Sequence, residues 1–170
     1  MFIKCFLSYE FMFKTTDKLK SEEKIMLREH LLKRRSSLQS PEVNFYSEKI
    51  CDILIENSYF CQAKSILFYS GYQHEVNLWR ALSYAFSLNK RIVLPRIDEE
   101  KSGVMRLFEV RDLEKDLVKG KFGIIEPSYG CIEVAVSEID LFFIPGVAFD
   151  FYGGRLGRGF GYYDRIFDSS

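Results

Sequence analysis

The stretch between residues 65 and 95 most constrains how this chain can fold. Two short apolar runs, 65–69 and 90–95, flank a segment from 77 to 88 in which apolar residues recur at helical spacing. A strand, a helix and a strand joined by short links predict a parallel crossover, because parallel strands need a long connection. Such a sheet is normally covered by helices. We therefore expect an α/β fold of three layers, with a mostly parallel central sheet and helices on both faces.

Apolar spacing predicts the other elements. Helices are expected over 22–38, 41–57 and 162–167, and strands over 105–110 and 139–144. The helical residues expected to face the core are Leu27, Leu31, Leu38, Tyr46, Ile50, Ile53, Leu54, Leu78, Leu82, Ala85 and Leu88. The run 139–144 is the clearest core strand, and the Pro-Gly pair after it ends the strand.

Length and composition bound the class of protein. A chain of 170 residues, 47% of them hydrophobic, can bury one substantial core. We expect one domain over 21–170, preceded by an N-terminal extension over 1–20. The net charge is zero, so a nucleic acid would need a local basic patch.

Location and assembly are also constrained by the sequence. Lys4 and Glu10 interrupt the apolar start, which argues against a signal peptide, and no apolar run reaches the roughly 18 residues that span a bilayer. The four cysteines include no C-x-x-C pair, which favours reduced thiols over a zinc site or disulfides. We expect a cytoplasmic monomer that binds neither membranes nor nucleic acids.

A glycine- and arginine-rich run over 153–165 suggests a binding site for a polyanion. Glycines let backbone N–H groups approach a ligand, and guanidinium groups match phosphate oxygens. The carboxylate of Asp164 could hold a magnesium ion. The spacing fits neither the P-loop nor the dinucleotide-binding fingerprint, since the glycines stand at 154, 157, 159 and 161.

Two other interpretations of this run stay open at this stage. It could be a flexible surface loop. Alternatively, residues 158–162, Arg-Gly-Phe-Gly-Tyr, fit the first half of an RNA-recognition signature and could bind single-stranded RNA. Tyr163 and Arg165 break the second half of that signature.

Charged residues elsewhere could contribute to the same site. Lys24, Arg28 and Arg35 form a basic stripe on the first expected helix, where a bound anion would offset their repulsion. The alternative is a solvated basic face. His74 and Glu75 follow the first expected strand, at the edge where α/β sheets bind ligands, although a residue in such a position is more often a surface loop residue than a ligand.

Residues 145–150 and 154–164, Pro-Gly-Val-Ala-Phe-Asp and Gly-Arg-Leu-Gly-Arg-Gly-Phe-Gly-Tyr-Tyr-Asp, closely resemble the signature of the 5-formyltetrahydrofolate cyclo-ligase family, also called 5,10-methenyltetrahydrofolate synthetase. Further matches are Lys24-x-x-x-Arg28, Glu75, Leu94-Pro95-Arg96 and the Gly-Ile-Ile-Glu-Pro segment 123–127. The resemblance covers about residues 21–167.

The resemblance implies an ATP- and Mg²⁺-dependent ligase of one-carbon metabolism that converts 5-formyltetrahydrofolate to 5,10-methenyltetrahydrofolate. The formyl oxygen would be phosphorylated to an iminophosphate, which allows the bridge nitrogen to attack. It also implies a further strand and a late aspartate beyond the Tyr-Tyr-Asp segment, so we expect a C-terminally short member of the family. A catalytically impaired protein that still binds folate or nucleotide is the alternative.

The resemblance also implies roles for individual residues. Arg158 and Lys24 would be catalytic, and Asp164 would bind magnesium. The residues implied to bind ATP are Lys24, Arg28, Arg155, Leu156, Gly157, Arg158, Gly159, Phe160, Gly161, Tyr162 and Tyr163. Those implied to bind the folate are Glu75, Arg158, Gly159, Phe160, Gly161 and Tyr162. Arg35 is still expected to be a solvated surface residue.

Overall fold

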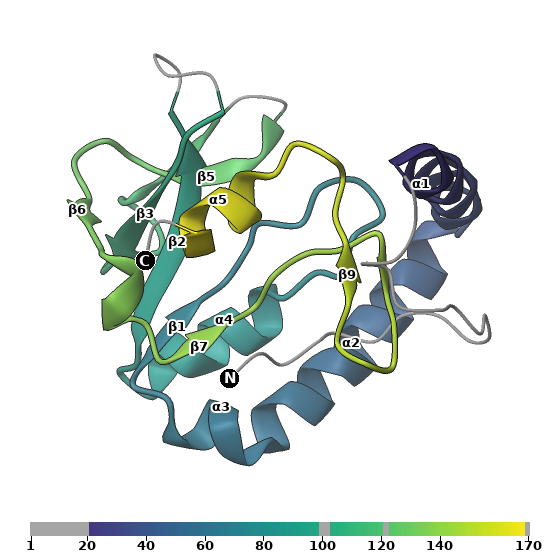
Figure 1. Ribbon diagram of the computed structural model, residues 1–170. Helices are drawn as coiled ribbons and strands as arrows, with labels where there is room; N and C mark the ends of the chain where they lie inside the picture. The colour runs from purple at the N-terminus through teal and green to yellow at the C-terminus, as the bar shows by residue number, and fades with distance from the viewer. Residues whose placement is uncertain (1–20, 99–102, 121–122, 169–170) are drawn as a thin grey trace.

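The computed structural model describes residues 21–98, 103–120 and 123–168, so the extension predicted over 1–20 lies outside the described residues. A five-stranded sheet with the order β6-β3-β2-β1-β7 forms its centre (Figure 1). The helices are α1 Ser21–Ser36, α2 Ser40–Glu56, α3 Ser58–Gln62, α4 Trp79–Ser87 and α5 Tyr162–Asp168, with a 3₁₀ turn over Val136–Glu138. The strands are β1 Ser65–Leu67, β2 Arg91–Ile97, β3 Met105–Val110, β4 Leu117–Lys119, β5 Ile125–Pro127, β6 Ile132–Glu133, β7 Leu141–Phe142, β8 Ala148–Phe149 and β9 Arg155–Leu156.

The middle of the sheet is parallel, as predicted. Strand β1 pairs in parallel with β2, where Ile66 lies opposite Ile92, and with β7, where Leu67 lies opposite Phe142. Helix α4 makes the crossover between β1 and β2. Strands β3 and β6 extend the sheet in antiparallel fashion beyond β2. Two separate hairpins, β4-β5 and β8-β9, lie outside this sheet.

Apolar side chains cover both faces of the sheet. Ile66 and Ile92 pack in one cluster with residues of α2, α3 and α4, whereas Leu67 and Val93 pack in a second cluster with Ile166 of α5. Successive residues of a strand point to opposite faces, so β1, β2, β3 and β7 each supply both clusters. The three-layer α/β architecture predicted from the sequence is thereby confirmed.

The face of α2 that meets the core differs from the predicted one. Ser47, Cys51 and Leu54 are buried, whereas Tyr46 and Ile53 are 42% and 67% exposed. Polar contacts fix this rotation, because Ser47 Oγ donates to Val43 O at 2.7 Å and accepts from Asn77 N at 3.0 Å. Burying a hydroxyl is tolerated when both of its hydrogen bonds are made.

Two further helix faces differ from expectation. Leu88 is 48% exposed and follows the end of α4 at Ser87, and the buried residues of this helix are Ala81, Leu82 and Ala85. None of the residues of α1 is buried, and the predicted core leucines Leu27 and Leu31 are only half-buried. Helix α1 therefore lies at the side of the molecule (Figure 1). None of the helices formed by the described residues is long and apolar enough to cross a bilayer.

Candidate ligand-binding site

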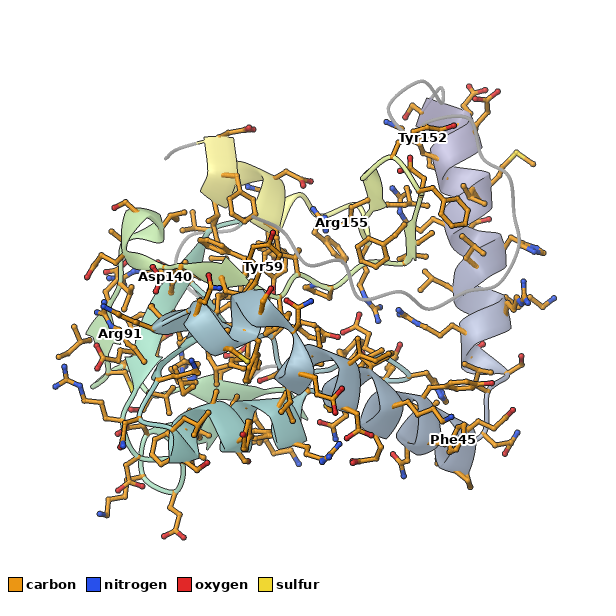
Figure 2. All side chains as sticks on the ribbon, turned by 90° about the horizontal axis from the view of Figure 1, so that it is seen from below. Phe45, Tyr59, Arg91, Asp140, Tyr152 and Arg155 are labelled. Carbon is orange, nitrogen blue, oxygen red and sulfur yellow. The ribbon has the colours of Figure 1, made fainter. Side chains whose placement is uncertain are left out.

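The segments that follow the parallel strands meet at one edge of the sheet. The loop after β1 carries Glu75, and the link after β7 carries Pro145 and Gly146. The β8-β9 hairpin follows, and residues 157–161 then connect β9 to α5. We call this connection the glycine loop. Figures 1 and 2 place β9, labelled by Arg155 in Figure 2, between α5 and α1.

A cavity of about 280 Å³ opens between α1, the glycine loop and α5. We call it the cationic cavity. Its lining is Lys24, Arg28, Glu75, Pro145, Gly146, Arg155, Leu156, Gly157, Arg158, Gly159, Phe160, Gly161, Tyr162, Tyr163 and Asp164. The structure thus brings together all of the site residues that the family resemblance implies, whereas His74 and Arg35 line a separate small cavity. Four cations and a row of glycines favour an anionic ligand here.

A second cavity, of about 530 Å³, adjoins the first. We call it the aromatic cavity. Its lining is Tyr69, Ser70, Tyr72, Gln73, Glu75, Pro95, Ile97, Met105, Ile124, Glu126, Pro145, Arg158, Phe160, Tyr162 and Tyr163. Glu75 and Arg158 belong to both linings. A flat ring system with a polar edge matches such a surface.

Side chains of α1 and α5 fix the shape of the glycine loop. Arg28 Nε donates to Gly157 O at 2.8 Å, and Arg165 Nη2 donates to Phe160 O at 2.8 Å. Gly159 and Gly161 have φ values of +100° and +67°, which L side chains rarely adopt. The glycines at these two positions are therefore required by the backbone.

Glu75 forms a charged centre between the two cavities. Its side chain is 8% exposed, Oε1 accepts from Arg158 Nε at 3.0 Å, and Oε2 accepts from Tyr72 N at 3.0 Å. The guanidinium of Arg158 also lies 5.0 Å from the centre of the Tyr72 ring. Among the described residues, Arg158 Nη2 is buried without a hydrogen-bond partner. A ligand oxygen at the cavity surface could accept this bond.

Asp164 is the carboxylate predicted to bind magnesium, and it forms an ion pair with Arg155 Nη2. Its side chain is 66% exposed on the wall of the cationic cavity. No cluster of three or more metal-ligating side chains occurs within the described ranges. A single carboxylate still fits Mg²⁺, because this ion often binds one or two carboxylates together with phosphate oxygens and water.

Tyr163 lies in the first turn of α5 and lines both cavities. Burial around its hydroxyl raises the pKa of Tyr163 above the usual range, and the nearby carboxylate of Glu75 raises it further. The Arg155 guanidinium, 5.8 Å from the ring centre, acts in the opposite direction. The phenol is therefore a neutral hydrogen-bond donor at ordinary pH.

Arg35 corrects one sequence expectation, because it is not a solvated surface residue. Its side chain is 18% exposed, and Nη2 lies 3.7 Å from Glu75 Oε1. Burial lowers the pKa of Arg35, and the like charge of Arg158 lowers it further, against the effect of Glu75. The heptad spacing to Arg28 was the sequence signal that could have placed Arg35 on the inner face.

The aromatic cavity also contains residues that the sequence did not single out, including Ile97 and Met105. They come from β2 and β3, so only the tertiary fold brings them to this cavity. Phe160, the key residue of the RNA interpretation, is 66% exposed. It lies in a loop, whereas RNA-recognition motifs stack bases on aromatic residues of a strand. Residues 158–161 therefore do not form the strand on which an RNA-recognition motif carries its aromatic residues.

Together, the fold and the site define a class: an α/β protein with a cation-lined cavity for an anion beside an aromatic cavity for a ring system. A family model of the 5-formyltetrahydrofolate cyclo-ligase family matches residues 20–170. The chain belongs to this family of ligases.

Relatives of known name agree with this assignment. A probable 5-formyltetrahydrofolate cyclo-ligase of Schizosaccharomyces pombe is 31% identical over 147 residues, which cover 85% of this chain and 71% of the relative. The Arabidopsis thaliana mitochondrial 5-formyltetrahydrofolate cyclo-ligase is 33% identical over 132 residues, covering 69% of this chain and 47% of the relative.

Solved structures show the same fold. The 5,10-methenyltetrahydrofolate synthetase of Aquifex aeolicus matches with a TM-score of 0.74 and 33% identity, over 85% of this chain and 72% of that chain. The Mycoplasma pneumoniae 5,10-methenyltetrahydrofolate synthetase matches with a TM-score of 0.67 and 22% identity, over 87% and 79% of the two chains.

Proposed function

We propose that this protein is a 5-formyltetrahydrofolate cyclo-ligase that uses ATP and Mg²⁺ to form 5,10-methenyltetrahydrofolate. The observation that carries the proposal is the common wall of the two cavities, whose charged residues are Glu75 and Arg158. The cationic cavity would hold the triphosphate and the aromatic cavity the pterin ring. Their junction would then bring the γ-phosphate to the formyl oxygen.

The reaction needs alignment more than a protein nucleophile. The formyl oxygen attacks the γ-phosphorus and ADP leaves, which gives the iminophosphate. The neighbouring bridge nitrogen then attacks the formyl carbon and loses its proton to phosphate or solvent, and phosphate leaves with the former formyl oxygen. Both steps depend on positioning the reacting atoms and on stabilising charge on the phosphoryl oxygens.

Cationic residues would carry the phosphoryl chemistry. Lys24 and Arg28 on α1 would bind phosphate oxygens from one side, and Arg155 would do so from the other. Arg158 lies at the junction, where its buried, unpartnered Nη2 could donate to the transferring group. Loop N–H groups from Gly157 to Gly161 would add neutral donors.

A magnesium ion would be held by Asp164 together with the phosphate oxygens of ATP. When bound, it would neutralise charge on the β- and γ-phosphates. Asp164 would exchange its ion pair with Arg155 for the metal, which would leave that guanidinium available to the nucleotide.

The folate would lie against the aromatic side chains. Tyr72, Phe160 and Tyr162 offer flat surfaces for the pterin, and the Glu75 carboxylate would accept hydrogen bonds from its donor-rich edge. The neutral hydroxyl of Tyr163 would donate to an acceptor on the ligand.

The direct test measures the absorbance of methenyltetrahydrofolate formed from 5-formyltetrahydrofolate and MgATP. We expect turnover that requires 5-formyltetrahydrofolate, ATP and Mg²⁺. A folded sample that yields no product would refute the enzymatic proposal. Thermal shifts with folate and with nucleotide would then identify a binding protein, because a ligand bound only by the folded state raises the melting temperature.

We also propose a cellular location and an oligomeric state for this protein. Cys51, Cys61 and Cys131 are free thiols. Free thiols persist in reducing compartments, which supports the cytoplasm. We further propose a monomer whose partners are 5-formyltetrahydrofolate and ATP, with no nucleic acid or membrane involved.

A further inference from the structure

We propose that Arg35 is a positioning residue for Glu75. Its guanidinium shares the negative charge of the Glu75 carboxylate with Arg158, so that Arg158 can turn to a ligand while Glu75 stays in place. This inference rests on the proposed function, since it concerns how the folate-binding carboxylate is held. It assigns a role to a residue that lines neither of the two larger cavities.

Three charged groups meet at one carboxylate oxygen. Glu75 Oε1 accepts from Arg158 Nε at 3.0 Å, and Arg35 Nη2 lies 3.7 Å from the same atom. The two guanidinium groups approach from different parts of the chain, since Arg35 is on α1 and Arg158 is in the glycine loop. One negative charge is therefore shared by two cations.

The three charged side chains of this cluster are largely buried. The side chains of Arg35, Arg158 and Glu75 are 18%, 28% and 8% exposed. An excess cation in such surroundings is unfavourable unless an anion compensates it. The cluster is therefore suited to an anionic ligand, because one guanidinium can turn to the ligand while the other retains Glu75.

The positions of the two arginines decide which one can turn. Arg158 faces both larger cavities and has a buried Nη2 with no hydrogen-bond partner among the described residues. Arg35 lies behind Glu75, on a separate cavity of about 50 Å³, and its Nη1 donates to Gly146 O at 3.4 Å. Arg35 can therefore keep Glu75 in place while Arg158 contacts a ligand.

The distance from Arg35 to Glu75 indicates how the residue acts. At 3.7 Å the contact is longer than a hydrogen bond, so it acts through charge. A lysine should then preserve much of the effect, whereas a methionine of similar length should not. The Arg35→Lys variant accordingly tests the mechanism as well as the residue.

The experiment is a double-mutant cycle on binding, so that it does not require turnover. Calorimetric titration of 5-formyltetrahydrofolate would compare the wild type, Arg35→Met, Glu75→Gln and the double variant. We expect Arg35→Met to weaken binding about fivefold, and the double variant to bind within about twofold of Glu75→Gln alone. Arg35→Lys should bind within about twofold of the wild type.

Controls separate this role from a general effect on the fold. Arg34→Met removes the neighbouring, exposed arginine of the same helix and should leave folate affinity unchanged. If Arg35→Met lowers the melting temperature, Arg35→Gln replaces it in the cycle. If the factors by which Arg35→Met and Glu75→Gln weaken folate binding simply multiply in the double variant, the inference is overturned while the proposed function stands. Failure of the wild type to bind folate would instead overturn the proposed function itself.

Discussion

Arg28 Nε donates to the carbonyl oxygen of Gly157 at 2.8 Å, although 129 positions separate the two residues in the chain. This bond joins α1 to the glycine loop. The same guanidinium would also lie 3.5 Å from a Cβ atom built on Gly159, so the loop passes close against it. Arg28 thus combines a structural contact with a position on the wall of the cationic cavity.

Arg28→Ala should raise the KM for ATP by about tenfold or more, because it removes a cation and frees the carbonyl of Gly157. Steady-state kinetics with varied ATP would measure this effect. Lys33→Ala, at an exposed position of the same helix, is the matched control and should leave the KM for ATP unchanged. An unchanged KM in Arg28→Ala would refute a phosphate contact at this position.

Asp164→Asn should abolish turnover or raise the magnesium concentration needed for half-maximal rate by about tenfold or more, because an amide is a much weaker ligand for this ion. Rates measured across a magnesium titration would show the shift. Asp168→Asn changes an exposed carboxylate on the same helix and serves as the control. Equal magnesium dependence in both variants would rule out Asp164 as the ligand.

Tyr163→Phe should change how stability depends on alkaline pH. The pKa of Tyr163 is raised in the folded state, mainly by burial, so the unfolded state loses its phenolic proton first, near pH 10. The contribution of the raised pKa to the free energy of unfolding is fully present below that pH, and it is lost as the pH rises toward the folded-state pKa. Wild-type protein should therefore lose stability more steeply above about pH 10 than Tyr163→Phe.

Urea unfolding at several pH values would test this expectation. Tyr59→Phe removes the hydroxyl of a tyrosine that is 45% exposed and should keep the wild-type pH dependence. If the stabilities of Tyr163→Phe and of the wild type fall in parallel above about pH 10, the pKa of Tyr163 is not raised in the folded state.

Phe143→Ala should destabilise the fold by about 3–5 kcal/mol, because it leaves a cavity in the core. Phe143 is 1% exposed, and its ring centre lies 5.1 Å from that of Phe68 and 6.4 Å from that of Phe60. Denaturant unfolding would measure the loss. Phe151→Ala, at a site that is 81% exposed, should change stability by less than about 0.5 kcal/mol.

The parallel crossover at the centre of the sheet could be predicted because its information is local. The apolar runs 65–69 and 90–95 and the helical pattern between them specify a parallel crossover, and the structure has it. The inner face of α2 could not be predicted in the same way. Ser47 turns inward because its hydroxyl finds Val43 O and Asn77 N, and such partners are visible only in three dimensions.

The candidate site shows the same division. The glycine- and arginine-rich run 153–165 can be identified from the sequence because its glycines, arginines and aspartate are contiguous in the chain. The inward position of Arg35 could not be predicted because its partner, Glu75, lies 40 positions further along the chain. The pair of Arg155 with Asp164 was also missed, since a hairpin end and a helix must first be brought together.

Helix α1, none of whose residues is buried, has a consequence for how the protein responds to its ligand. Most helices are held by an apolar face, whereas this one meets the protein body partly through the guanidinium groups of Arg28 and Arg35. A bound polyanion would cross-link the helix to the glycine loop. Amide hydrogens of α1 should therefore exchange with solvent much more slowly once the nucleotide is present.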